Sequence, residues 1–451
     1  MVALTSVTPM TRKNSEPRTF GVVQKEGPRP EPSWFYDRRQ AAFQRFSELG
    51  FPTARQEAWK YTNLGALAQT TFQSAPAHPN AQISKRDSSK LQAFEIDSYR
   101  MVLIHGVFSE SLSALEALPP GAIVMGLRKA LNTHAALVRE HLARYVQDAQ
   151  NAFAALNTAH FQDGVFVWLE EDIVLPKPIQ LVFLSTASDV PLISQPRNLI
   201  VLGRRARAAL IEHHGSLDGG TYLANGITEI ALGEGASLDH MKLERESPRA
   251  FHMATTQVSQ GSDSVFSSFV LDLGGKLVRN HLNVTLNGPG AQSHLLGLYL
   301  TEGEQQVNHY TLIDHPKPHG LSRQLYKGIL GGASQGVFSG RIFVHQDAQQ
   351  TDAAQTNKNL LLSEGATVHT KPHLEIFADD VKCTHGAAVG QLDENAIFYL
   401  KSRGLDETVA RKILLYGFAS DIIERISIPA LRGTLNQLVL AKLEHLDEGG
   451  R

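Results

Sequence analysis

Five short stretches share one pattern and decide the fold: LGRRARA (202–208), LGEGASL (232–238), SQGSDSV (259–265), NGPGAQS (287–293) and SEGATVH (363–369). In each, a polar or glycine turn precedes a small residue, at positions 206, 236, 262, 291 and 366. The first four are spaced by 30, 26 and 29 residues, and Gly332–Ala333 fits a further turn within the last gap. Repetition near this length predicts a β-solenoid, whose coils bury their apolar faces by stacking. Spacing alone leaves a large jelly roll or sandwich as the alternative, because its turns also recur, about every 8 to 12 residues.

The stretch from Val165 to about Leu392 has the composition of successive strands. It shows no convincing helical periodicity, and its short alternating or β-branched runs are separated by glycine. Glycine supplies 23 of the 188 residues from Gly203 to Gly390, against 13 of the other 263. Such enrichment indicates a dense series of turns, so we expect a solenoid core over residues 161–392.

The N-terminal part of the chain has a mixed character. Residues 1–32 are expected to be a disordered arm, because a stretch rich in proline and charge buries too little apolar surface to order itself. Residues 33–160 are expected to form a mixed domain, with a helix from Ser33 to Gly50, a buried strand over 101–108 and an amphipathic helix over 123–146.

The C-terminal part, residues 393–451, is expected to be helical. Asp393 and Asp406 each precede a run with helical periodicity and can accept hydrogen bonds from the free amides of its first turn. Gly404 separates the two runs, and a further amphipathic helix follows Pro429. Helices there could cover the end of a solenoid.

Composition excludes several classes of protein. The chain has 451 residues, 43 Lys plus Arg, 45 Asp plus Glu and a net charge of −2; this near-neutral charge, with no basic stripe in the sequence, argues against nucleic acid as a partner bound by phosphate neutralisation. Its single cysteine cannot form an internal disulfide, which favours a reducing compartment. The first twenty residues contain no long uninterrupted apolar stretch and no apolar run approaches 18 residues, so we expect a cytoplasmic protein with no membrane partner.

The sequence offers no nucleotide or hydrolase motif in the structural context that its chemistry requires. Gly274–Gly275–Lys276 continues with Leu277 and lacks the leading glycine of a P-loop, and no GxGxxG stands between a strand and a helix. The stretch GASQG (332–336) matches GxSxG by letter, but no run with helical periodicity follows it, so it lacks the strand–turn–helix context of a nucleophile elbow. Asp314 and Arg323 flank the stretch HPKPHGLS, which leaves a β-helix carbohydrate-active enzyme as an alternative.

The strongest local candidate for chemistry is the segment VKCTHG (381–386). On a strand Cys383 and His385 would face the same side, with Thr384 on the other. A thiolate beside an imidazole suits zinc, iron or persulfide sulfur, but two ligands do not fill a tetrahedral site. On spacing alone we favour a structural cysteine and histidine; as ligands, the pair would need another chain to complete the site. The other donors nearby lack metal-motif spacing: His369, His373, Glu375, Asp379 and Asp380.

Histidine is concentrated in the expected core, which holds 13 of the 19 between His213 and His385. These side chains could line one face of a solenoid as ligands or could pair with strand backbone. No HExxH or comparable constellation occurs, and no metal is assigned to them. The scattered set is His213, His214, His240, His281, His294, His309, His315 and His319.

The stretch from His315 to Leu405 closely resembles the core of the SufB/SufD family of iron-sulfur cluster assembly scaffolds. The resemblance rests on QTDAAQTNKNLLLS (350–363), PHLEIFADDVKCTHG (372–386) and FYLKSRGL (398–405). Two earlier stretches, RQEAWKYTNL (55–64) and LNTAHFQDGVFV (156–167), look like the SufD branch, as does the single cysteine. A SufB-like, cluster-carrying subunit is the alternative within the family.

This resemblance implies a mainly β protein with a right-handed parallel β-helix between N-terminal α/β and C-terminal helical regions. It implies a non-catalytic scaffold that pairs with a SufB-like homologue, or with itself as a homodimer, and binds SufC, an ABC-type ATPase. A nascent iron-sulfur cluster would form at the partner interface, with His385 as a metal ligand and Cys383 beside it. Arg411, Leu414 and Phe418 would lie on the SufC-docking surface. No cofactor would be held by the chain alone, and flavin in the complex is left open.

Overall fold

The computed structural model describes residues 22–23, 32–76, 94, 96–146 and 151–448. Most of the expected arm, residues 1–32, lies outside these ranges. Within it, Val22–Val23 forms strand β1, which pairs in parallel with β2 (Phe72–Ser74).

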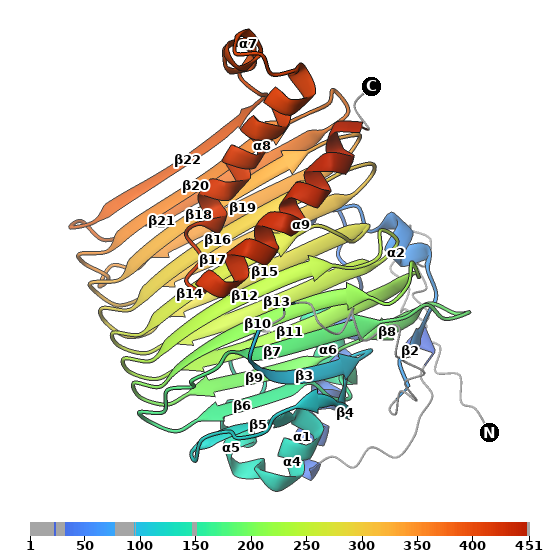
Figure 1. Ribbon diagram of the computed structural model, residues 1–451. Helices are drawn as coiled ribbons and strands as arrows, with labels where there is room; N and C mark the ends of the chain where they lie inside the picture. The colour runs from blue at the N-terminus through green and yellow to red at the C-terminus, as the bar shows by residue number, and fades with distance from the viewer. Residues whose placement is uncertain (1–21, 24–31, 77–93, 95, 147–150, 449–451) are drawn as a thin grey trace.

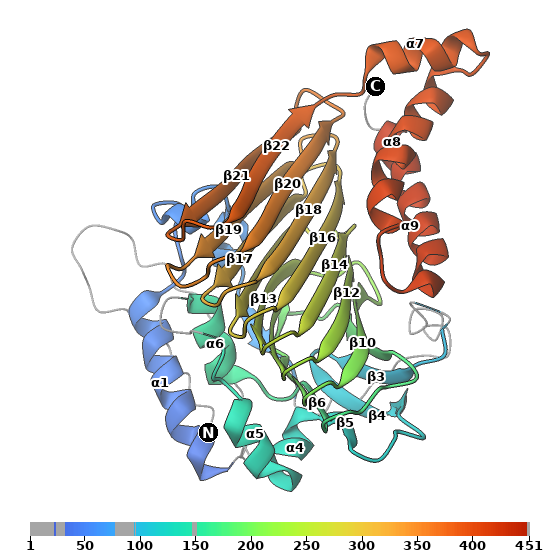
Figure 2. The same ribbon diagram turned by 90° about the vertical axis from the view of Figure 1, so that its left-hand side faces the viewer.

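The described core is a β-solenoid of two parallel sheets that face each other (Figures 1 and 2). Each coil contributes one strand to each sheet, so strands two apart in chain order are hydrogen-bonded neighbours. Sheet 1 stacks β8 (Leu192–Ser194), β11 (Tyr222–Leu232), β13 (Phe251–Gln260), β15 (Leu277–Leu286), β17 (Gln306–His315), β19 (Gln335–Val344) and β21 (Thr367–Ile376). Sheet 2 stacks β7 (Ile179–Ser185), β10 (Arg207–Ser216), β12 (Ser237–Arg245), β14 (Val265–Asp272), β16 (Gln292–Thr301), β18 (Leu321–Leu330), β20 (Asp352–Leu361) and β22 (Lys382–Gly390). The expectation of a parallel solenoid is confirmed.

The turn pattern marks the corners of the coils, with one correction. Ala206, Ala236 and Ala291 each precede a strand of sheet 2 and are fully buried, so only small side chains fit. In the third stretch the equivalent residue is Ser264 and not Ser262. Ser264 is also fully buried, and it directly precedes β14, which begins two residues later than the pattern suggested. Ala366 precedes β21 and marks a corner of sheet 1.

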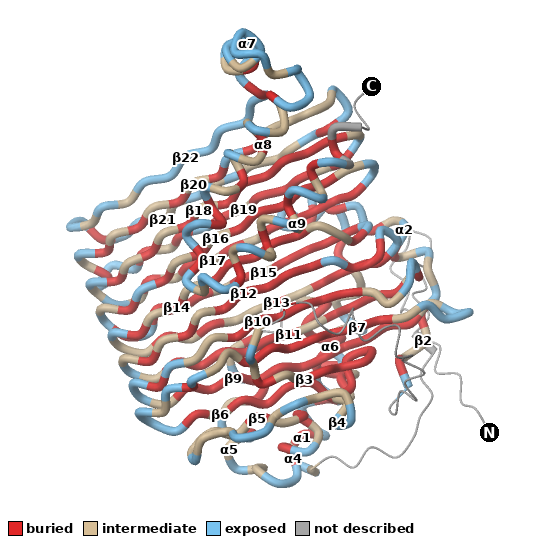
Figure 3. Tube along the Cα trace, in the orientation of Figure 1, coloured by how far each residue is buried: buried red, intermediate tan, exposed pale blue. Residues whose placement is uncertain are grey.

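Each strand of the core presents its two faces to different partners. On β14, Phe266 points between the sheets, whereas Phe269 points outward. The outer face of sheet 2 is covered by α8 (Glu407–Ile423) and α9 (Pro429–Glu448), and α7 (Glu394–Ser402) lies beyond them (Figure 2). This packing leaves long buried stretches in the central strands and exposed residues at the last coil (Figure 3).

The C-terminal helices begin where the sequence indicated. The side chain of Asp393 accepts a hydrogen bond from the amide of Asn395, and that of Asp406 accepts one from the amide of Val409, both at 2.9 Å. Helix α8 runs through Gly417 without a break, because its buried face packs continuously on sheet 2.

The N-terminal region packs against the first coils and the outer face of sheet 1. Its helices are α1 (Ser33–Leu49), the 3-10 turn Glu57–Trp59, α2 (Gly65–Gln69), α4 (Leu127–Thr133), α5 (Ala135–His141) and α6 (Ala152–His160). The Arg279 guanidinium lies between the rings of Trp59 and Tyr310, 3.6 and 3.7 Å from their centroids, and so fastens this region to sheet 1.

Two expectations for the N-terminal region were wrong. Residues 123–146 do not form one helix: β5 (Ala122–Gly126) pairs antiparallel with β6 (Val165–Leu169), and two short helices follow. The expected strand over 101–108 is a hairpin of β3 (Tyr99–Ile104) and β4 (Val107–Ala114), which turns at His105 and Gly106, both with positive φ. β9 (Arg197–Leu202) lies between β6 and β11.

Candidate functional site

The last coil of the solenoid is open on one side. Among the described residues, β21 and β22 end their sheets and each pairs with one neighbouring strand only. The side chains of Ile376, Phe377 and Val389 are exposed there, with Phe377 60% exposed. A row of unpaired backbone groups beside apolar side chains is a surface that a further strand can cover.

Cys383 and His385 lie on the inward face of this last coil. Their register partners on β20 are Ala353 and Gln355, both buried between the sheets. Cys383 is partly buried against the interior core, whereas His385 is exposed at the open end. Since alternate residues of a strand face the same side, the two side chains project together.

Two buried oxygen atoms near the open end have no hydrogen-bond partner among the described residues. They are Oε1 of Gln355, which is the register partner of His385, and Oγ1 of Thr370 on β21. The amide nitrogen of Gln355 is already engaged by Oε1 of Gln324 at 2.6 Å. Buried acceptors without donors cost folding free energy, so groups from outside the chain could satisfy them.

The Cys383 thiol is not activated in the chain alone. Burial raises its pKa above the ordinary value, and the nearby Asp352 carboxylate raises it further, against a hydrogen bond from the amide of Ala353. Because the thiolate is the form that binds metal and attacks sulfur, Cys383 needs a nearby cation to become an effective ligand.

The remaining donors close in sequence do not join Cys383 and His385. The His369 ring stacks on Tyr61 with centroids 4.0 Å apart, and Nε2 of His373 lies 2.9 Å from Oε1 of Glu375. In the described part of the chain, no group of three or more His, Cys, Asp or Glu side chains is placed to hold a metal ion. The pair at the open end is therefore an incomplete ligand set.

Several of the unassigned histidines lie inside the solenoid and pair with carboxylates. Oxygens of Glu212 lie 3.2 Å from Nε2 of His214 and 3.3 Å from Nε2 of His240, and Asp272 lies 3.0 Å from His309. Burial lowers the pKa of His214 to about 4. Burial alone would raise the pKa of Glu212, but hydrogen bonds from the two histidines hold it well below its usual range. Their local partners are carboxylates of the same chain.

The helical surface differs from the expectation in detail. Leu414 and Phe418 are partly buried against the core under α8, and the ammonium of Lys327 donates to the Phe418 carbonyl at 2.9 Å. The large apolar side chains that are exposed on α7 and α8 belong to other positions, which the sequence analysis did not single out: Phe398 (73% exposed), Tyr399, Val409 and Ile413. Arg411 lies beside them, only partly exposed.

The residues of the carbohydrate-enzyme alternative share no site. Asp314 lies on sheet 1, where it bonds His345 at 2.8 Å, and Arg323 lies on sheet 2, where it bonds Asp352 at 2.6 Å. Since Ile313 and Ser322 beside them are buried between the sheets, the two charged side chains point outward from opposite faces.

Fold and site geometry define a parallel β-solenoid protein with flanking helices and an open last coil. Two family models match the chain: "SUF system FeS cluster assembly, SufBD core domain" over residues 183–418, and "SufBD protein N-terminal region" over residues 29–181. The chain belongs to the SufBD family of the SUF system for iron-sulfur cluster assembly. In the described ranges, no helix has the length and apolar character needed to cross a membrane.

Relatives of known name cover nearly the whole chain. It is 36% identical to an iron-sulfur cluster assembly SufBD family protein of Synechocystis sp., over 91% of both chains. It is 31% identical to the iron-sulfur cluster assembly protein SufD of Escherichia coli, over 91% of this chain and 93% of the other. Identity to the chloroplastic protein ABCI7 of Arabidopsis thaliana is 29%, over 86% and 82% of the two chains.

Proposed function

We propose that this chain is a SufD-type scaffold subunit, without turnover of its own, in a cytoplasmic SUF assembly complex. Its open last coil would pair with a SufB-like homologue, and its C-terminal helices would bind a SufC-type ABC ATPase. The similarity to the Escherichia coli SufD protein and the single cysteine favour the SufD role. A scaffold with one thiol is poorly equipped to hold a cluster alone.

The observation that carries this proposal is the ligand pair at an unpaired strand edge. Cys383 and His385 lie on the inward face of the last coil, whose outer edge is unpaired within the described residues, and two ligands do not complete a metal site. A partner that extended the sheets past β21 and β22 would bring its own side chains next to both. It could also supply donors to the unsatisfied oxygens of Gln355 and Thr370.

In this complex the nascent cluster is cargo. His385 would bind iron through a neutral imidazole nitrogen, so binding requires an unprotonated ring. Cys383 would become a thiolate only when a cation adjoins it, because burial raises its pKa. Dimerisation of the ATPase on binding ATP would pull the docked helices together and strain the paired last coils, giving iron and sulfur access to His385.

The test combines co-purification with cluster delivery. Tagged wild-type chain should recover a homologous SufBD chain and an ABC ATPase from a lysate. His385→Ala should recover both partners but mature clusters at least 10-fold more slowly. Thr384→Ala, on the same strand and facing the opposite side, is the matched control and should behave as wild type. Wild-type maturation by His385→Ala would refute the site, and loss of both partners would show that the residue is structural.

Reconstitution of the isolated chain with iron and sulfide separates the two roles within the family. A SufD-type subunit should show no stable cluster absorbance, because its described residues contain no complete ligand group. A cluster retained through gel filtration would contradict the proposed role and favour a SufB-like, cluster-carrying subunit.

A further inference from the structure

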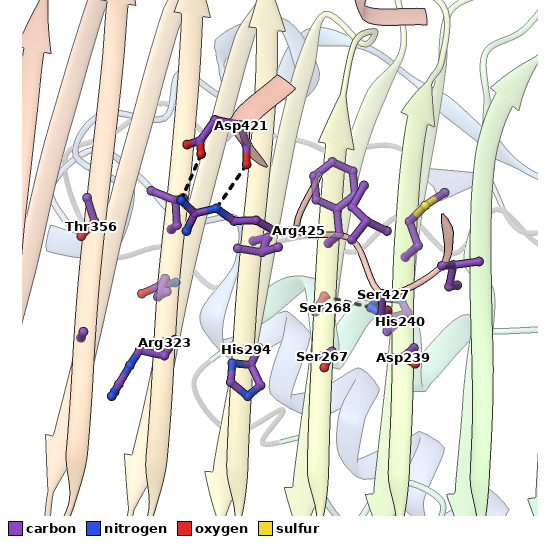
Figure 4. Close-up of a pocket in the computed structure, with 18 of the residues that line it drawn as sticks. Asp239, His240, Ser267, Ser268, His294, Arg323, Thr356, Asp421, Arg425 and Ser427 are labelled. Atoms are coloured by element: carbon purple, nitrogen blue, oxygen red, sulfur yellow. Dashed lines mark hydrogen bonds and ion pairs between the residues drawn. The ribbon is translucent and has the colours of Figure 1, made fainter. Parts of the chain in front are cut away.

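A cavity of about 540 Å³ separates the outer face of sheet 2 from the turn that joins α8 to α9. Strands β12, β14, β16, β18 and β20 form its floor, and Ile426, Ser427 and Ile428 form its roof. Figure 4 shows side chains from these neighbouring strands beneath Asp421 and Arg425 of the helical segment. The cavity lies on the outer face of the sheet, away from the inward face that carries Cys383 and His385.

The floor of the cavity has an apolar row and a polar row. Met241, Phe269, Leu296 and Leu325 follow one another in register across four strands. Leu296 and Leu325 are only partly buried, so apolar surface remains open to the cavity. Two residues earlier on the same strands, and on the same face, lies the polar row of Asp239, Ser267, His294 and Arg323 (Figure 4).

Two cationic residues line different parts of this floor: the register partner of Arg323 is Ala354, so Lys358 lies four residues farther along β20, about 13 Å at about 3.3 Å per residue. Arg323 of β18 and Lys358 of β20 line the cavity, and Lys358 forms no ion pair within the described residues. Arg323 donates to Asp352, which lies outside the lining. Asp239 lies three strands from Arg323, about 14 Å away at the usual strand spacing of about 4.8 Å.

Asp421 in the roof does not cancel this charge. Its carboxylate lies 2.5 Å from the ammonium of Lys327 and 3.1 Å from the guanidinium of Arg425, so two cations already compensate it. His294 lies beside Arg323, and burial followed by the charge of Arg323 lowers its pKa, which keeps the ring neutral and able to hydrogen-bond.

We propose that this cavity binds a small amphipathic anion, a carboxylate or phosphate ester with an apolar chain or ring. The anionic group would lie at Lys358, which forms no ion pair within the described residues, and the apolar body would lie over Leu296 and Leu325 beneath Ile428. The volume is within the usual range of ligand sites, about 300 to 1,000 Å³, and apolar lining with a few convergent polar groups is their common composition. An occupant would bridge sheet 2 and the α8–α9 turn.

Decanoate is a suitable probe because it combines a carboxylate with a flexible apolar chain. Isothermal titration into the full-length chain should show one saturable site. Decanol, which lacks the charge, should bind at least 10-fold more weakly, and inorganic phosphate, which lacks the apolar body, should not compete. Bound decanoate should also slow amide hydrogen exchange over residues 424–428, because it would hold the turn against the sheet.

Two variants test the location. Lys358→Glu should weaken decanoate binding about 10-fold, whereas Lys412→Glu, the same change on α8 outside the cavity, should not. Leu325→Trp should fill the floor and abolish binding. Ser267→Trp, on β14 two strands away in the same floor, replaces it if circular dichroism shows that Leu325→Trp is misfolded. Unchanged affinity in Lys358→Glu together with unchanged affinity in the folded tryptophan variant would overturn the proposal, as would equal affinity for decanol and decanoate.

Discussion

At the scale of single residues, Glu229 shows how the N-terminal region is joined to the solenoid. Its buried carboxylate accepts hydrogen bonds from both Nε and Nη2 of Arg197, at 3.1 and 2.6 Å. It also accepts from the backbone amides of Ala143, Tyr145 and Val146, at 2.9 to 3.1 Å. These hydrogen bonds compensate the cost of removing the carboxylate from water. They also hold the segment that follows α5 against β11.

We predict that Glu229→Gln lowers the free energy of unfolding by about 3 to 5 kcal/mol, because it leaves the Arg197 charge buried without a counterion. Urea unfolding followed by circular dichroism measures the change. Glu171→Gln is the matched control: Glu171 pairs with Arg204 at 3.1 Å in an exposed position, and its loss should leave the unfolding midpoint unchanged. Equal midpoints for the two variants would contradict the assignment of Glu229 as an anchor.

At the scale of elements, helix α8 has one face buried against sheet 2 and one face exposed. Leu415, Ala419 and Ile422 are buried against sheet 2, whereas Val409 and Ile413 are exposed on the other face. Phe398 and Tyr399 of α7, a helix in contact with α8, are exposed as well. An apolar surface of this kind, beside charged residues, is suited to a protein partner.

We predict that Ile413→Asp abolishes capture of the ABC ATPase while leaving the unfolding midpoint unchanged, because a charge placed on the exposed face opposes an apolar contact. Ile422→Ala, on the buried face of the same helix, should instead cost about 2 to 5 kcal/mol of stability through the cavity that it leaves. Pull-down and urea unfolding of both variants check this. ATPase capture by Ile413→Asp at the wild-type level would show that the partner uses another surface.

His315, at the end of β17, predicts a pH dependence of stability. It is fully buried, its Nε2 lies 3.0 Å from Oγ of Ser322, and burial lowers its pKa to about 4. As the pH falls, the His315 ring therefore becomes protonated near pH 6.5 in the unfolded chain, but only near pH 4 in the folded chain. The stability due to the neutral ring is complete above pH 6.5 and falls as the pH drops toward 4.

His315→Gln removes this proton uptake. Between pH 6.5 and 4, the unfolding free energy of the variant should therefore fall less steeply with decreasing pH, by up to about 1.4 kcal/mol per pH unit. Urea unfolding at intervals of half a pH unit, for parent and variant, gives the two slopes. Glu246, whose pKa burial raises to about 7, acts in the opposite direction, but it contributes equally to both proteins and cancels in the difference. Identical slopes would refute the prediction.

Local patterns anticipated elements whose cause is local. The caps at Asp393 and Asp406 and the corner alanines were predictable because a free amide or a buried corner constrains one position. The helix expected over 123–146 failed because the Ile123 segment becomes a strand only by pairing with β6, far along the chain. The exposed face of α8 could not be read from its sequence, since both faces carry aliphatic residues and only the position of sheet 2 distinguishes them. The prediction that Cys383 and His385 lie on the same face needed only that the segment be a strand, because alternate residues of any strand share a face.

At the scale of the whole molecule, the solenoid is a stack in which each coil is stabilised by its neighbours. Interior coils have a neighbour on both sides, but the last coil, β21 and β22, has one only among the described strands. Stability in such stacks is approximately a sum of coil and interface terms, so local opening should be easiest at the open end. The same coil carries the ligand pair, which links the proposed partner to the ordering of the site.

We predict a gradient of amide hydrogen exchange in the free chain, fastest in β22, slower in β20 and slowest in β14 and β16, because each step inward adds a neighbouring coil. A bound SufB-like homologue should protect residues 367–390 and leave β14 and β16 unchanged, since it would supply the missing neighbour at the open end alone. Exchange mass spectrometry of the free chain and of the complex measures both effects. A homodimer would give the same protection without the homologue, so the free sample is kept monomeric by dilution and checked by light scattering. Strand β22 exchanging as slowly as β14 in that monomer, or partner-dependent protection confined to the N-terminal helices, would show that pairing does not occur at the last coil.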